Sequence, residues 1–230
     1  MGRIGRRRSA AGLSARASQV RVKIYPLGDT ALLAELGTRL DTALNTRAIA
    51  LASALKKRRD VRQAVAAHGT VTVQFDPEHI SFDALSEAVR RLVRKRPPLD
   101  EPGRLHRIPV IYDGPDLDDV CARVGLSRDR VIEVHAQPIY RVFLVGFVPG
   151  WAYLGPLAEE LVLPRREEPR TRVPAGSVAI ANEETGIYPF DSPGGWHLIG
   201  RTSIKLFLPD SDPPSVFRAG DRVKFFPTQS

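Results

Sequence analysis

The sequence predicts an α+β protein with two domains, and three observations support this prediction. Residues 20–96 alternate β-type segments with two amphipathic helical segments. Residues 97–103 contain proline and glycine without hydrophobic periodicity, as expected for a linker. Residues 104–230 hold many short β-type segments between glycines and prolines. We therefore expect a small sheet covered by two helices, followed by a closed or nearly closed β-barrel.

The first module has the order strand, strand, helix, strand, strand, helix. Asp41 and Ser81 stand immediately before the two helical patterns and are suitable N-caps. A Pro-Leu-Gly-Asp turn at 26–29 separates the first two strands. We expect strands at 20–25, 30–36, 64–67 and 70–75, and helices at 41–59 and 81–96.

The second module begins with a strand and two short helices and then becomes rich in turns. Residues 139–145, which are apolar except for Arg141, form the clearest predicted strand in this part of the chain. We expect helices at 116–124 and 127–135, and strands at 106–112, 139–145, 177–181, 186–188, 197–199, 205–208 and 222–226.

The net charge of +8 is concentrated near the N-terminus. Residues 1–20 hold five arginines and no acid, whereas residues 21–230 hold 29 basic and 26 acidic side chains. Residues 1–19 are therefore predicted to be a basic disordered tail, and the balanced remainder, which has no nucleic-acid-binding motif, argues against a nucleic-acid partner. No apolar run approaches the roughly 20 residues that span a bilayer. Cys121 is the single cysteine, which fits a reducing, cytoplasmic setting.

The usual signatures of a self-contained catalytic site are missing from the sequence. It has no GxxxxGK[ST] loop for nucleotide phosphates, no HExxH, no CxxC and no GxSxG. The five histidines show no spacing suited to a metal. We therefore expect no metal site, no tightly bound cofactor and no complete ATP site within this chain.

Three segments between 146 and 201 combine glycine and proline with arginine or aromatic residues. Arginine offers a planar fork for carboxylate or phosphate, and consecutive glycines let backbone N–H groups approach an anion. A turn-rich barrel also needs glycine and proline for structure alone, so each residue has a purely structural alternative. His197 is a catalytic candidate by type and position only, and a structural role is the more common one. The substrate- or anion-binding candidates are Tyr153, Arg170, Arg172, Ser177, Tyr188, Gly194, Gly195 and Arg201.

These segments also carry a family resemblance. The stretches GFVPGWAYLGPL, LPRREEPRTRVPAGSVAIA, TGIYPFDSPGGWHLIGRT and GDRVKFFP, together with GDTALLAELG near the N-terminus, resemble the family called allophanate hydrolase subunit 1 or Kip-type kinase inhibitor. Most members are now assigned as the B subunit of 5-oxoprolinase. The resemblance spans roughly residues 22–227. Asn182 stands where the family commonly has glycine, so we expect that turn to differ from the family's.

The resemblance implies both a fold and a partnership. It implies a ferredoxin-like N-terminal domain joined to a cyclophilin-like β-barrel, with boundaries at 20–96 and 104–230. It also implies that the 5-oxoprolinase subunits C and A act with this chain to convert 5-oxo-L-proline to L-glutamate, with ATP as co-substrate. The chain alone is then expected to be inactive.

Other functions stay open on the sequence alone. Some relatives bind and inhibit a sensor histidine kinase. Related domains are carboxyltransferase-like components of enzymes of urea and allophanate metabolism. A prolyl isomerase is suggested only by the barrel, and a fold is weak evidence for an activity. Genes for subunits A and C beside this one would favour the hydrolase, and a neighbouring kinase gene would favour the inhibitor.

Overall fold

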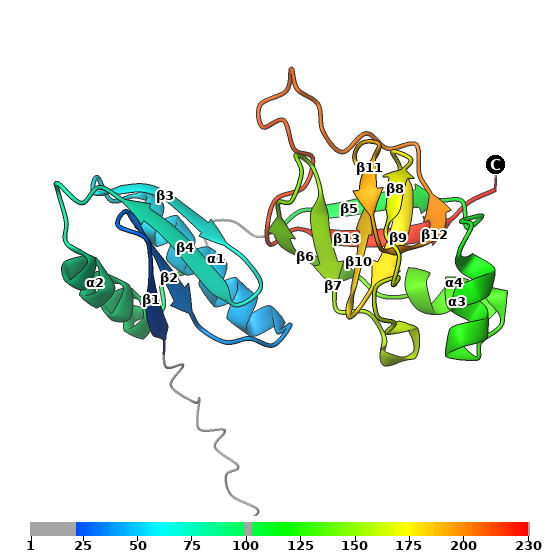
Figure 1. Cartoon of the computed structure of the whole chain (residues 1–230), viewed down its shortest axis with the longest axis horizontal. Coiled ribbons are helices and arrows are strands. Elements are labelled where there is room, and N and C mark those ends of the chain that lie inside the picture. Colours follow the sequence, from blue (N-terminus) through cyan, green and yellow to red (C-terminus); the bar gives the residue numbers. More distant parts are fainter. Residues whose placement is uncertain (1–21, 99–102, 230) are drawn as a thin grey trace, which may run out of the picture.

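The computed structural model describes residues 22–98 and 103–229. The predicted tail at 1–19 and residues 99–102 of the predicted linker lie outside the described residues. The chain contains both helices and sheets, and its second part forms a nearly closed, barrel-like sheet, as predicted (Figure 1).

The N-terminal half, residues 22–98, is a four-stranded antiparallel sheet with two helices. Its strand order is β1-β2-β4-β3. Helix α1 packs on β3 and β4, and α2 lies beside α1 (Figure 1). The Asp41 carboxylate accepts the Leu44 N–H at 2.8 Å, which confirms this N-cap. The elements are β1 (Lys23–Leu27), β2 (Ala31–Glu35), α1 (Thr42–Lys56), β3 (Val61–Ala66), β4 (Thr70–Phe75) and α2 (Phe82–Lys95).

The C-terminal half, residues 103–229, is built on a seven-stranded sheet of order β12-β9-β10-β7-β6-β13-β5. The pair β5 and β13 is parallel, and the other pairs are antiparallel. A two-stranded ribbon, β8 with β11, completes it. The elements are β5 (Leu105–Val110), α3 (Leu117–Val124), α4 (Arg128–Ala136), β6 (Tyr140–Val145), β7 (Ala152–Gly155), η1 (Glu159–Leu161), β8 (Arg170–Val173), β9 (Ser177–Ala181), β10 (Glu184–Ile187), β11 (Ser192–Gly194), β12 (His197–Arg201) and β13 (Arg222–Pro227).

The two edges of the seven-stranded sheet meet and nearly close it. Ile111, just after β5, donates its N–H to the Arg201 carbonyl at 2.9 Å and accepts the Arg201 N–H at 2.8 Å. Asp116 N–H also donates to the Leu198 carbonyl on β12. These bonds satisfy edge groups that an open sheet would leave unpaired. Helices α3 and α4 lie together at one end of the sheet (Figure 1).

Several secondary-structure predictions were wrong in detail. Residues 205–208 form no strand, since only Phe207 pairs, with Ser215. The facing segment contains Pro213 and Pro214, which lack N–H donors and cannot sustain a ladder. Conversely, the glycine- and arginine-rich stretches, for which no strand was predicted, contain the strands β7, β8 and β11. Their short length and their prolines and glycines hide the alternating pattern.

A polar network lies inside the barrel around His135, which is fully buried. The Thr185 hydroxyl donates to the Ala179 carbonyl, so it accepts from Nε2–H of His135 at 2.9 Å. Nδ1 of His135 then accepts the Tyr112 hydroxyl proton at 2.7 Å. Both ring nitrogens are thus satisfied in the neutral form, and burial lowers the pKa of His135 to about 3.

The two halves meet through side chains of α1 and the loop after β3. Buried Asn45 donates Nδ2–H to the carbonyls of Ala67 and Phe143, both at 2.9 Å. Its Oδ1 accepts from Nε of Arg141 at 2.8 Å. One amide therefore links the first sheet, through Ala67, to strand β6 of the second.

Within the described ranges, no helix is long and apolar enough to cross a membrane.

Candidate functional site

An aromatic cluster on the outer layer of the barrel forms the base of the candidate site. Trp151 is buried, and its ring centroid lies 4.7 Å from that of Tyr188 and 5.1 Å from that of Trp196, both edge to face. Tyr153 packs 5.7 Å from Trp151 and is only partly buried. The two tryptophans are thus core residues, and Tyr153 is the aromatic side chain that remains accessible.

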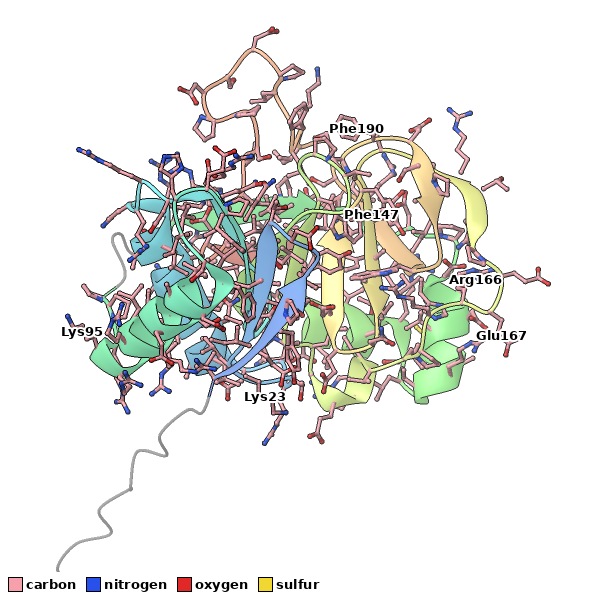
Figure 2. All side chains as sticks on the ribbon, turned by 60° about the vertical axis from the view of Figure 1, so that its left-hand side comes forward. Lys23, Lys95, Phe147, Arg166, Glu167 and Phe190 are labelled. Atoms are coloured by element: carbon pink, nitrogen blue, oxygen red, sulfur yellow. The ribbon has the colours of Figure 1, made fainter. Side chains whose placement is uncertain are left out.

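Asp116 organises two arginines beside this cluster. The residue is only 4% exposed, and Oδ1 accepts from Nη2 of Arg170 at 2.6 Å and from Nη1 of Arg166 at 3.1 Å. Oδ2 accepts the Leu198 N–H at 2.7 Å. Burial alone would raise the pKa of Asp116. The hydrogen bonds from Arg170 and Leu198 and the arginine charges outweigh burial and hold that pKa below its usual value. Figure 2 shows Arg166 on the barrel, next to Glu167.

The sequence analysis did not identify Asp116 as a site residue, because an aspartate at the start of a helix is usually a helix cap. It does precede α3, but its side chain makes no capping hydrogen bond. Both oxygens are used by groups 50 to 82 residues away in sequence. Those separations leave no local pattern that a sequence reading could detect.

Donors remain unpaired around Asp116. Among the described residues, Nη1 of Arg170 and Nε of Arg166 are buried without a hydrogen-bond partner. A buried guanidinium donor without a partner is costly, and either a water or a bound anion would satisfy it. The arrangement therefore suits a carboxylate or phosphoryl oxygen, with Asp116 fixing the two guanidinium groups.

Tyr188 and the glycine pair lie within the same site. Burial raises the pKa of Tyr188, while the Trp196 N–H and the charges of Arg165 and Arg170 work in the opposite direction. Gly194 pairs with Arg170 across β11 and β8, and a Cβ there would sit 2.1 Å from the Tyr188 hydroxyl oxygen. Only glycine fits this contact. The Gly195 carbonyl accepts the Arg166 N–H at 2.8 Å, which holds the arginine segment against β11.

Three other candidates are placed elsewhere. Arg172 is 78% exposed and forms an ion pair with Asp191, and Arg201 pairs with Asp113 at 2.9 Å on the surface. The Ser177 hydroxyl donates to the Pro174 carbonyl, which is a turn contact. The register shift between Ser192 and Gly194 breaks strand alternation, which explains why Arg170 and Arg172 have different partners despite their spacing.

His197 is buried behind the site and not within reach of solvent. Its Nε2 bonds the Pro164 carbonyl at 2.9 Å, so Nε2 carries the proton. Its Nδ1 has no partner among the described residues. This contact anchors the strand β12 to the segment that leads into Arg165 and Arg166, which is a positioning role.

A residue pair that the sequence analysis did not single out joins the site to the N-terminal half. Nε2 of His68, in the turn between β3 and β4, lies 2.6 Å from Oε1 of Glu184 on β10. The hydrogen bond to Glu184 raises the pKa of His68, and partial burial opposes this. The His68 ring also meets the edge of Tyr153, at 5.9 Å between centroids. Tyr153 is therefore in contact with both halves of the chain.

Carboxylates, histidines and the cysteine do not gather into a metal site anywhere in the described ranges. The chemistry of the candidate site is that of fixed positive charge, backbone donors and one accessible phenol. Such a site can bind and orient an anionic substrate and stabilise negative charge that develops on it.

Comparison with known proteins gives the family. A family model described as carboxyltransferase domain, subdomain C and D, matches residues 22–217. The B subunit of 5-oxoprolinase from Escherichia coli O157:H7 is 42% identical over 211 residues, which is 90% of this chain and 96% of that protein.

Solved structures agree with this. The structure of TTHA0988 is 37% identical with a TM-score of 0.77; it covers 91% of this chain, which spans 40% of that longer chain. Kluyveromyces lactis urea carboxylase, 18% identical, shares the fold with a TM-score of 0.71 over 90% of this chain and 22% of its own. The chain thus belongs to the 5-oxoprolinase B-subunit family of carboxyltransferase domain C and D proteins.

Proposed function

We propose that this chain is the B subunit of an ATP-dependent 5-oxoprolinase, a lactam hydrolase that opens 5-oxo-L-proline to L-glutamate. One observation carries the proposal: Asp116 holds Arg166 and Arg170 side by side, and each arginine keeps a buried donor without a partner among the described residues. This arrangement occurs in a chain of the 5-oxoprolinase B-subunit family. In the same proposal the N-terminal half is the ferredoxin-like domain and the barrel is the cyclophilin-like domain, working in the cytoplasm.

The reaction needs what this site offers. A lactam carbonyl is a poor electrophile, so ATP first transfers its γ-phosphoryl group to the carbonyl oxygen and leaves as ADP. One water adds to the activated carbon, the ring C–N bond opens, and a second water releases phosphate from the acyl phosphate. Arg170 and Arg166 are placed to hold the substrate carboxylate or the transferred phosphoryl group.

The chain does not act alone in this proposal. It lacks a phosphate-cradling loop, so nucleotide binding and the rest of the acid–base chemistry fall to the partner subunits A and C. The loops above the aromatic cluster supply a docking face for one of them. Phe147 is 71% exposed and has a φ of 77°, an unusual conformation for a bulky residue. Phe190 is also exposed on a neighbouring loop (Figure 2).

Reconstitution tests the proposal. The chain alone should neither hydrolyse ATP nor open 5-oxoproline, and the mixture with subunits A and C should form glutamate coupled to ADP release. Glutamate is followed by an enzyme-linked assay with and without ATP. Full activity of A and C without this chain would remove it from the enzyme and favour a kinase-inhibitor role. Activity on urea or allophanate alone would keep the enzyme class and overturn the substrate.

A further inference from the structure

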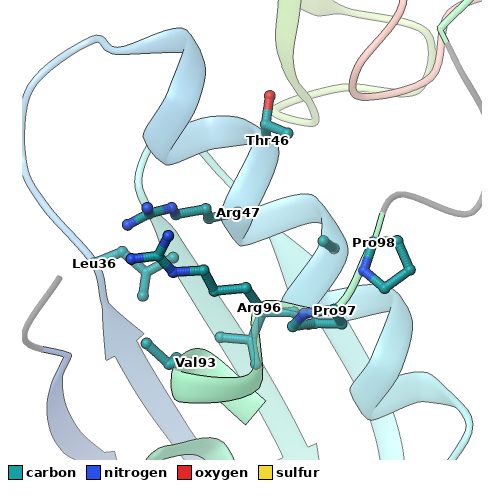
Figure 3. A pocket seen from close by; sticks show the side chains of 9 residues that line it. Leu36, Thr46, Arg47, Val93, Arg96, Pro97 and Pro98 are labelled. Carbon is teal, nitrogen blue, oxygen red and sulfur yellow. The ribbon is translucent and has the colours of Figure 1, made fainter. Parts of the chain in front are cut away.

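A cavity lies in the N-terminal half and shares no residue with the candidate site in the barrel. It has a volume of about 280 Å³ and opens between α1, the end of α2 and the prolines that follow α2 (Figure 3). Its lining is apolar except at one edge. The apolar lining residues include Leu36, Ala50, Leu51, Val93 and Pro97.

Two arginines stand at that edge. Arg47 comes from α1 and Arg96 from the residue that ends α2, and Figure 3 shows their guanidinium groups extending side by side. Neither side chain forms a hydrogen bond or ion pair within the described part of the chain, and none of the described residues that line the cavity is acidic. Two neighbouring like charges repel, and an anion between them removes that repulsion and gains two guanidinium forks.

The backbone holds Arg96 in an unusual conformation at this position. Its φ of 51° and ψ of 68° are left-handed, which is the conformation that glycine usually provides where a helix ends. Pro97 follows and fixes the direction of the chain. The left-handed turn at Arg96 ends α2 beside the cavity, and the Arg96 side chain is part of the lining.

The size and the lining define the ligand class. A volume of 280 Å³ corresponds to about nine waters in the liquid, so a ligand on the order of ten non-hydrogen atoms fills it. We propose that this cavity binds a small monocarboxylate whose body is apolar, with the tail on Ala50 and Val93 and the carboxylate between Arg47 and Arg96. The site is independent of the proposed lactam hydrolase function, because the barrel site has a different location and a polar ligand.

Calorimetric titration of the full chain with octanoate, which has ten non-hydrogen atoms, tests the proposal. Octanoate should bind with one-to-one stoichiometry. Octylammonium, 1-octanol, acetate and 5-oxoproline should each bind at least tenfold more weakly, since each lacks either the charge or the apolar body. Octanoate binding no tighter than that of octylammonium would overturn the carboxylate assignment.

Variants locate the site. Arg47→Gln combined with Arg96→Gln should weaken octanoate binding at least tenfold, because both forks are lost. Ala50→Met should do the same by filling the cavity, and a thermal melt shows whether this variant is folded. The control is Arg91→Gln, an exposed arginine of α2 that does not line the cavity. Equal affinity in the double variant and the control would overturn the proposal, even if the Ala50 variant failed to fold.

Discussion

Asp116 and Arg170, 54 residues apart, are joined by a 2.6 Å hydrogen bond that fixes the guanidinium of the candidate site. The carboxylate is almost fully buried, and it receives Arg166 and a backbone N–H as well. A buried carboxylate that has three donors holds its partners rigidly, which is the arrangement expected behind a binding group.

Asp116→Asn should destabilise the protein by about 3 kcal/mol, because it leaves two arginines without their counter-charge. The pKa of Asp116 is below its unfolded value, so its contribution is present above about pH 4 and is lost as pH falls through the folded pKa. Urea unfolding at pH 7 and pH 3 measures both effects. Asp113→Asn, which breaks the surface pair with Arg201, should cost less than about 1 kcal/mol. Equal losses in the two variants would contradict the role given to Asp116.

Arg170→Ala should remove most activity of the reconstituted complex, by roughly a hundredfold in kcat/KM, because a charge-assisted anion contact is lost. Arg170→Lys should recover little, since one ammonium cannot bind Asp116 through one nitrogen and an anion through another. The matched control is Arg172→Ala, whose side chain is exposed and paired with Asp191. Co-purification with the partner subunits and an unchanged Tm show whether the variant is intact. A variant that fails to fold would make Arg170 a structural residue.

Glu184→Gln should weaken the contact between the halves in a pH-dependent way. The pKa of His68 is raised in the folded protein, so the stability it contributes is fully present below about pH 6.5 and is lost as pH rises through the folded pKa. The variant should therefore lose about 1 kcal/mol or less at pH 6 and converge with the wild type at pH 9. Glu183→Gln, an exposed neighbour, serves as the control in the same urea series. A loss independent of pH would show that His68 is neutral in this contact.

His135→Gln should flatten the fall in stability on acidification. The folded protein keeps His135 neutral with a pKa of about 3, whereas the unfolded chain takes up a proton near pH 6.5. Stability should thus fall below that pH by up to about 1.4 kcal/mol per pH unit. Unfolding at pH 7, 6 and 5 compares the slopes, with the exposed His79→Gln as control. An unchanged slope in His135→Gln would assign the acid loss to carboxylates instead.

The sequence predicted the elements whose patterns are local. Asp41 and Ser81 capped their helices as expected, and residues 70–75 and 177–181 form strands with the predicted bounds. Strand β8 was missed because Arg170 and Arg172 flank a threonine and show no apolar alternation. This segment is a strand because it pairs with β11.

Only part of the candidate site was predicted, because sequence patterns report residues that are close along the chain. Arg170, Tyr188 and Gly194 do converge, since each lies within one short stretch of chain that the barrel folds together. Asp116 and His68 were missed because their partners are distant in sequence. No spacing rule predicts a contact across 54 or 116 residues. Arg201 was chosen for its residue type, and its surface partner Asp113 could be known only from the closure of the sheet.

The position of β13 between β5 and β6 affects how the protein is made. Asp221, beside β13, accepts the N–H of Arg104, 117 residues earlier, and its carboxylate also contacts His106 of β5. At about 5–20 residues per second, a ribosome needs roughly 6–23 s to reach Asp221 after Arg104. Until then β5 has no neighbour on its β13 side, whereas the hairpins of the first sheet are complete much earlier. The barrel is therefore the part of the nascent protein whose strand pairing is completed last, and its β5 edge stays exposed for longest during synthesis.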